Sequence, residues 1–153
     1  MSYTVEPIGT VHATRTDPVD DLWGGQESRI VIVDSLPAEA LFGLASFSHV
    51  EVLFPFHQVT LDNITQGARH PRNNPNWPAV GIFAQRGKNR PNRIGSTICR
   101  VLGVEGRVLT VLELDAIDGT PVLDIKPVMS EFLPREALRQ PACVSELMRD
   151  YWS

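Results

Sequence analysis

STICRVLGVEGRVLTVLEL, residues 96–114, is the stretch that decides the fold. Two apolar runs rich in β-branched residues, Ser96–Val104 and Arg107–Leu114, flank the tetrapeptide Val104-Glu105-Gly106-Arg107. Strand-length runs on either side of a short glycine-containing segment are typical of a β-hairpin, in which glycine supplies the positive φ of the turn. The stretch therefore predicts two antiparallel strands and a tight turn.

Similar runs recur outward from this hairpin, each of strand length and each bounded by Gly, Pro, Asn or Asp. They are Tyr3–Ala13, Arg29–Asp34, Ser48–His57, Ala79–Ala84 and the shorter Val122–Lys126. Only two segments have helical patterns, Pro37–Phe42 and Cys143–Trp152. Many short strands with few helices predict an all-β (mainly β) fold, a small six- to seven-stranded β-barrel with one or two short helices.

The chain has 153 residues, which suits one domain with a sizeable core. Its composition, 42% hydrophobic and 21% charged, excludes disordered and fibrous proteins. The two cysteines, Cys99 and Cys143, are too few for a disulfide framework, so we expect a reduced, cytoplasmic protein. No leader pattern opens the chain, and no apolar run approaches the about 20 residues of a membrane helix. We therefore expect no membrane partner.

The formal net charge of −4 is unevenly distributed. Residues 63–104 contain no Asp or Glu and carry +7, which leaves −11 for the rest of the chain. The seven cations are Arg69, Arg72, Arg86, Lys88, Arg90, Arg93 and Arg100. A window of one sign indicates an anion-binding surface, such as one for phosphate. The alternative is that the positive segment packs against the acidic remainder or against another subunit.

Standard catalytic motifs are absent from the sequence. There is no G-x-G-x-x-G, no Walker loop and no G-x-S-x-G elbow. The four histidines lack metal-ligand spacing, so we expect no metal. Cys99 alternates with apolar neighbours in a predicted strand, which favours packing over a role as nucleophile.

Polar residues are densest in two segments. Gly81–Gly95 runs from an apolar stretch into a loop with four cations, where arginines can hold carboxylate or phosphate groups; the alternative is a basic turn. Asp115–Pro127 contains three carboxylates and a lysine, which suit a ribose diol, a cation or an amine; the alternative is a charged hairpin with an internal Asp–Lys pair. The prolines of His70–Pro78 predict a loop.

Together these segments resemble the signature of the TsaA-like family, also called the TrmO or YaeB family. The matching residues are Phe83-Ala84-Gln85-Arg86, Arg90-Pro91-Asn92-Arg93-Ile94-Gly95, Asp118–Pro127, Pro7–Val11 and Leu44–Val50. The resemblance spans residues 5–132, nearly the whole chain. It implies a TsaA-like β-barrel domain over residues 1–132, with residues 133–153 as a C-terminal helical extension of the same domain.

The resemblance implies an S-adenosylmethionine-dependent methyltransferase that works as a homodimer on N6 of a modified adenosine next to the anticodon of tRNA. It implies cofactor binding by His57, Gln58, Arg86, Ser96, Asp115, Ala116, Ile117 and Asp118. We expect Arg86 to hold the methionine carboxylate and the turn Asp115–Asp118 to contact the adenosine end. Methyl transfer from a sulfonium requires placement of the acceptor rather than a metal or a nucleophile, and no catalytic residue is assigned.

We expect five of the other six basic residues of the window to contact substrate phosphates. They are Arg69, Arg72, Lys88, Arg90 and Arg93. The loop departs from the family pattern at Gly87-Lys88, where Ser-Pro is usual, and at Arg93, where proline is usual. Because these changes affect the acceptor side, two alternatives stay open. One is a methyltransferase for another RNA or a small molecule, and the other is a non-catalytic module that binds S-adenosylmethionine or RNA.

Overall fold

The computed structural model describes residues 1–153 and confirms the predicted hairpin. Strand β6 (Ile94–Glu105) pairs antiparallel with β7 (Val108–Leu112), and Gly106 in the connection has a φ of 57°. The turn lies one residue later than predicted, because the pair Glu105–Val108 closes the ladder. The register shifts between Val101 and Gly103, the irregularity of a β-bulge, which increases the local twist of a strand.

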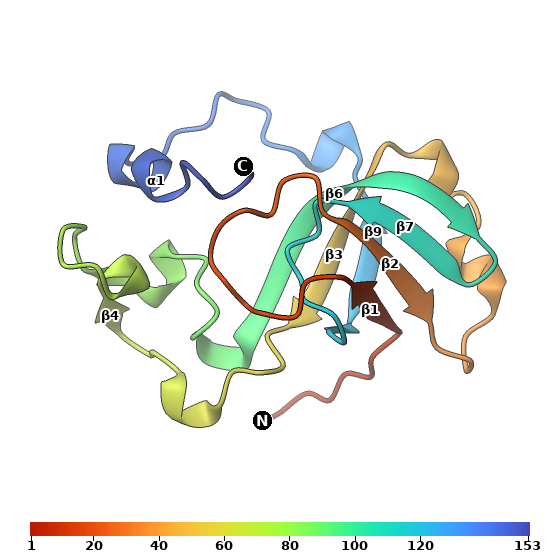
Figure 1. Ribbon diagram of the computed structural model, residues 1–153, viewed down its shortest axis with the longest axis horizontal. Helices are drawn as coiled ribbons and strands as arrows, with labels where there is room; N and C mark the ends of the chain where they lie inside the picture. Colours follow the sequence, from red (N-terminus) through yellow and green to blue (C-terminus); the bar gives the residue numbers. More distant parts are fainter.

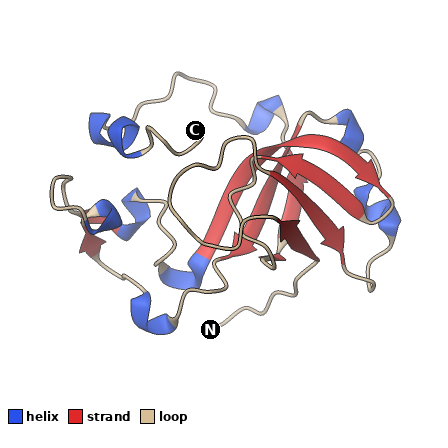
Figure 2. Ribbon diagram, viewed as in Figure 1, coloured by secondary structure: helices blue, strands red, loops and turns tan.

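Five further strands complete one antiparallel sheet in the order β8-β1-β2-β7-β6-β3-β9. They are β1 (Gly9–Ala13), β2 (Glu27–Ile32), β3 (His49–Pro55), β8 (Pro121–Val122) and β9 (Asp124–Pro127). The edge strands β8 and β9 are separated only by Leu123, whose N–H donates to the carbonyl oxygen of Leu53 on β3 at 2.8 Å. The sheet therefore nearly closes on itself (Figures 1 and 2), and the predicted all-β barrel is confirmed.

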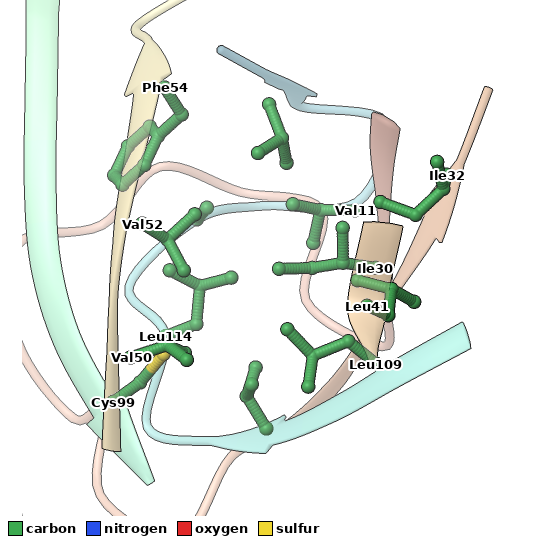
Figure 3. Close-up of a cluster of buried hydrophobic side chains, with 13 residues drawn as sticks. Val11, Ile30, Ile32, Leu41, Val50, Val52, Phe54, Cys99, Leu109 and Leu114 are labelled. Carbon is green, nitrogen blue, oxygen red and sulfur yellow. The ribbon is translucent and has the colours of Figure 1, made fainter. Parts of the chain in front are cut away.

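The barrel interior is filled by side chains that alternate along the strands. On β3, Val50, Val52 and Phe54 are buried while the residues between them are half-buried, the period of two expected of a strand. These side chains belong to a cluster of 13 buried residues contributed by most of the barrel strands and by the segments that follow β2 and β7 (Figure 3). Cys99 lies within this cluster and is 2% exposed, which confirms its packing role.

Three strand predictions need correction. Only Gly9–Ala13 of the run Tyr3–Ala13 is a strand, and Val122–Lys126 is divided between β8 and β9. The run Ala79–Ala84 is not a barrel strand: Val80–Gly81 (β5) pairs with β4 (Ala68–Arg69) in a separate two-stranded sheet, and a 3-10 turn follows. The barrel offers this segment no free edge, because β8 and β9 meet and every inner strand already has two neighbours.

The helical predictions are also shortened by the structure. Pro37–Phe42 forms a 3-10 turn over Ala38–Leu41, after which Phe42 is extended and Gly43 takes a left-handed conformation with a φ of 92°. The remaining 3-10 turns are Leu44–Ser46, Leu61–Asn63, Pro71–Asn73, Ile82–Ala84, Pro91–Arg93 and Ser130–Phe132. The C-terminal helix α1 covers Ala142–Leu147 instead of Cys143–Trp152. No helix combines the length and the apolar composition needed to cross a membrane.

Three segments gather at one end of the barrel, away from the β6–β7 turn (Figure 1). We call residues 57–93 the loop layer, residues 14–25 between β1 and β2 the strap, and residues 148–153 after α1 the tail. The tail lies along the strap, since the N–H of Leu22 donates to the carbonyl of Asp150 at 3.0 Å. This contact explains why α1 ends early: the chain leaves helical geometry at Met148 to reach the strap.

Candidate functional site

Arg86 lies where the loop layer meets β6. It follows the 3-10 turn Ile82–Ala84, and its Nη2 donates to the carbonyl oxygen of Ser96 at 2.5 Å. The Ser96 hydroxyl donates in turn to Glu51 Oε1 on β3 at 2.6 Å. Arg86 is exposed and forms no ion pair, so this hydrogen bond orients the guanidinium without neutralising its charge. The remaining N–H groups of Arg86 can therefore bind an anion.

Asp115 lies three residues after the end of β7 and is held by two hydroxyl groups. Thr97 Oγ1 on β6 donates to Oδ1, and the phenol of Tyr151 in the tail donates to Oδ2. The main chain on both sides is anchored by Leu114 and Ala116, which are 0% and 3% exposed. Asp115 forms no ion pair with any lysine or arginine. Its carboxylate is thus firmly placed and retains its charge for a ligand.

The other residues of the turn Asp115–Asp118 have different surroundings. The side chains of Ala116 and Ile117 are buried, so only their main-chain atoms are available to a ligand. Asp118 is exposed, and its Oδ1 accepts a hydrogen bond from the N–H of Ala13 at 3.0 Å. Its own N–H donates to the carbonyl of Arg15 at 2.8 Å, so Asp118 joins this turn to the strap.

His57 and Gln58 lie apart from the Asp115 carboxylate in the network of hydrogen bonds. Both are exposed in a turn at the end of β3, which is closed by a hydrogen bond from the N–H of Val59 to the carbonyl of Phe56. Arg93 holds this turn, because its Nη1 donates to the carbonyl of Val59 at 2.7 Å. The structure thus brings His57 and Gln58 together with Arg93, and it joins Arg86 to Ser96.

The basic side chains of the loop layer mostly bind main-chain carbonyls. Arg90 Nη1 donates to the carbonyl of Gln85 at 2.6 Å, and Lys88 Nζ donates to that of Pro18 in the strap at 3.2 Å. Arg69 Nε donates to the carbonyl of His70 at 3.4 Å. These contacts with neutral groups hold the side chains but leave the positive charges uncompensated. The predicted anion-binding surface is consistent with this arrangement.

Arg72 is the exception among the seven cations. Its Nη1 and Nη2 donate to Asp21 in the strap at 3.0 and 2.8 Å, and it is the only one of the seven that forms an ion pair. The alternative that positive residues pack against the acidic remainder therefore holds for Arg72. The internal Asp–Lys pair considered for the second polar segment is also present, since Lys126 Nζ lies 2.9 Å from Asp124 Oδ2.

Sequence reasoning missed Tyr151 and Thr97, the two donors to Asp115. The sequence pattern places Tyr151 on an apolar helical face and Thr97 in a strand. Nothing in the local pattern relates Tyr151 to a carboxylate 36 residues away. Burial, followed by the charge of Asp115, raises the pKa of Tyr151, so the phenol stays protonated and remains a donor.

Burial likewise raises the pKa of Cys99 to about 12, which keeps it an unreactive thiol.

The structure also has a cavity that lies apart from these residues. An apolar cavity of about 410 Å³ is lined by residues such as Leu36, Phe47 and Met129, and it includes none of the predicted site residues. No group of three or more His, Cys, Asp or Glu side chains is arranged to hold a metal ion. The polar groups suited to a charged organic ligand are those around Arg86 and Asp115.

Comparison with known proteins supports a relationship over the same region. Residues 14–132 match the family described as the tRNA-methyltransferase O N-terminal domain. A mouse tRNA (adenine(37)-N6)-methyltransferase is 42% identical over 63% of this chain and 22% of its own length. A probable S-adenosyl-L-methionine-binding protein of Methanothermobacter thermautotrophicus is 35% identical over 83% of this chain and 90% of its own length.

Solved structures give the same result. A crystal structure of TrmO from Pseudomonas aeruginosa superposes with a TM-score of 0.75 at 29% identity, covering 94% of this chain and 62% of that one. The present chain thus spans about a fifth of the mouse relative and less than two thirds of the Pseudomonas protein. The match over 14–132 includes Arg86, Ser96 and the turn Asp115–Asp118. The chain therefore belongs to the tRNA-methyltransferase O N-terminal domain family.

Proposed function

We propose that this protein is an S-adenosylmethionine-dependent methyltransferase that modifies N6 of a modified adenosine next to the anticodon of tRNA. The observation that carries the proposal is the combination of an uncompensated cation, Arg86, and an uncompensated anion, Asp115, at the barrel end where the basic loop layer begins. The names of the relatives, tRNA (adenine(37)-N6)-methyltransferase and S-adenosyl-L-methionine-binding protein, support both the reaction and the cofactor.

The donors and acceptors of the site fit S-adenosylmethionine. Arg86 retains N–H groups for the methionine carboxylate, because Ser96 occupies only one of its nitrogens. In the turn Asp115–Asp118, the main-chain N–H groups of Ala116 and Ile117 have no partner within the protein and can contact the adenosine end. His57 and Gln58 are exposed for further contacts. When bound, the cofactor supplies an electrophilic methyl group. The protein's contribution is placement of the acceptor nitrogen, an effect worth several kcal/mol of the barrier.

Four basic residues are suited to bind RNA phosphates. Arg69, Lys88, Arg90 and Arg93 are held by main-chain carbonyls and keep their charge. Arg72 would first have to release Asp21, so its proposed phosphate contact competes with the strap. Binding through these residues is expected to weaken steeply with salt, because phosphate contacts release counterions.

A homodimer and a cytoplasmic location are part of the same proposal. Sedimentation of the purified protein tests whether it is a homodimer.

The variant Arg86→Ala tests the cofactor assignment. A charge-assisted hydrogen bond is worth about 1.5–3 kcal/mol, so we expect affinity for S-adenosylmethionine to fall about 10- to 100-fold in calorimetric titration. Arg100→Ala is the matched control, since Arg100 is exposed on the same strand that carries Ser96 and makes no ion pair. Equal affinity in the two variants would remove Arg86 from the site.

A non-catalytic module that binds S-adenosylmethionine is the second candidate. It is favoured by the Methanothermobacter relative, which this chain spans almost fully and which is named only for binding. Transfer of a labelled methyl group to unmodified and modified tRNA, to other RNA pools and to small metabolites separates the candidates. Label in tRNA supports the proposed enzyme, and label in another acceptor assigns a different substrate. Binding with no label in any pool supports the module.

A further inference from the structure

The tail is built into the candidate site rather than attached loosely to the surface. The N–H groups of Leu22 and Trp23 in the strap donate to the carbonyls of Asp150 and Tyr151 at 3.0 and 2.7 Å. A Cβ atom on Gly24 would overlap the carbonyl of Trp152, so strap and tail are in direct backbone contact. These contacts place the ring of Tyr151 at a defined position relative to the barrel.

The strap itself is ordered by contacts between its own residues. Trp23 is 4% exposed, and the guanidinium of Arg15 lies 3.7 Å from the centre of its ring. Arg15 Nη1 also donates to the carbonyl of Leu22 at 2.9 Å. The tail therefore rests on an ordered segment, and Tyr151 is held by more than its own hydrogen bond.

The hydroxyl of Tyr151 has one partner, and that partner is the carboxylate of Asp115. Thr97 occupies the other carboxylate oxygen, so two neutral donors orient Asp115 while its full charge is retained. Each carboxylate oxygen accepts more than one hydrogen bond, which leaves lone pairs for a further donor. A carboxylate held in this way is suited to accept a cationic group.

Arg86 belongs to the same small region. It donates to the carbonyl of Ser96, the residue immediately before Thr97 on β6. Arg86 and Asp115 nevertheless form no ion pair with each other. Arg86 and Asp115 are therefore a separate cation and anion bound at the adjacent residues Ser96 and Thr97, and such a pair matches the carboxylate and ammonium of a zwitterionic amino acid.

We propose that Tyr151 is a positioning residue of the cofactor site, which holds the Asp115 carboxylate to accept the ammonium group at the amino-acid end of S-adenosylmethionine. Arg86 binds the neighbouring carboxylate, and the main-chain N–H groups of Ala116 and Ile117, which have no partner within the protein, remain for the adenosine. This inference rests on the proposed function, because it assumes that the cofactor binds beside Arg86. It adds a residue beyond 132, outside the matched family region.

The experiment compares two ligands in calorimetric titrations of the full chain. S-adenosylhomocysteine carries the amino-acid end, whereas 5′-methylthioadenosine lacks it. In Tyr151→Phe we expect affinity for S-adenosylhomocysteine to fall about tenfold and affinity for 5′-methylthioadenosine to stay unchanged. Tyr3→Phe is the matched control, since Tyr3 is 87% exposed and its hydroxyl contacts only Met1.

Other outcomes overturn the inference in distinguishable ways. If Tyr151→Phe binds S-adenosylhomocysteine normally while Arg86→Ala does not, the proposed function stands and the role of Tyr151 is lost. If Tyr151→Phe weakens both ligands equally, the tail only closes the site. If the wild-type chain binds neither ligand, the proposed function fails and the inference fails with it. Should Tyr151→Phe unfold, Asp115→Asn serves instead and must show the same ligand selectivity.

Discussion

The barrel and the loop layer meet at the candidate site, but each is stabilised by a different kind of interaction. In the barrel, a cluster of 13 buried residues lies inside a continuous antiparallel ladder. In the loop layer, Val59 and Ile82 are the only buried residues, and many ordering contacts run from side chains to main-chain carbonyls. Gln85, for example, donates through Nε2 to the carbonyls of Arg69 and Val80, at 3.0 and 2.9 Å.

This difference has a consequence for function. Burial of apolar surface is non-directional and gives the barrel its stability. Hydrogen bonds to carbonyls are directional and individually modest, but they fix arginine and lysine side chains without cancelling their charge. The barrel thus supplies a rigid wall carrying Ser96 and Thr97, and the loop layer supplies ordered positive charge beside it.

The largest effect should come from emptying part of the barrel interior. Leu109 is 0% exposed, and Leu109→Ala removes buried apolar contacts and leaves a cavity. We expect a loss of about 2–5 kcal/mol in the free energy of unfolding, measured by denaturant titration. Phe83→Ala, at a loop-layer side chain that is 78% exposed, should change it by less than about 0.5 kcal/mol. Equal losses would contradict the distinction between the two regions.

A substitution at the strap–tail contact should have the next largest effect. In Gly24→Ala the new methyl group would overlap the carbonyl of Trp152, and one of the two segments must move. We expect about 1–3 kcal/mol of destabilisation together with faster proteolysis of the tail. Gly67→Ala is the control, because a Cβ there meets nothing within 4 Å. An unaffected tail in Gly24→Ala would show that strap and tail are not in tight contact.

Alkaline pH should weaken the barrel through Cys99. Its pKa rises from 9.0 to about 12 on folding, so the unfolded thiol ionises first and stability is lost as pH rises through this window. The slope for one group is about 1.4 kcal/mol per pH unit. Relative to the wild-type chain, Cys99→Ala should flatten the fall in free energy of unfolding between pH 9 and 12. The pKa of Tyr151 is also raised, so part of the fall should persist in Cys99→Ala.

The smallest effect should come from the ion pair between loop layer and strap. Arg72 is partly buried against Asp21, so removing the pair should cost about 0.5–1 kcal/mol and less at high salt. A double-mutant cycle with Arg72→Ala and Asp21→Ala isolates this coupling. A coupling energy of zero would mean that this ion pair does not help to hold the strap.

Local patterns identified most of the barrel because each strand carries its own period of two. The hairpin around Gly106 was predicted because turn and strands are adjacent in the chain. Ala79–Ala84 has the same apolar composition as a barrel strand, but closure of the sheet leaves it no partner there. Cys143–Trp152 has a helical period, but its last residues bind the strap instead.

The sequence by itself determined the strand-rich barrel, the packing role of Cys99 and the acid-free basic window, since these follow from neighbouring residues. It also placed Arg86, Ser96 and Asp115 among the candidate site residues through their motifs. Only the tertiary structure decided that Tyr151 reaches Asp115 across 36 residues and that Arg72 pairs with Asp21 across 51. Such contacts depend on how closure of the barrel brings distant segments together, and no local period encodes that.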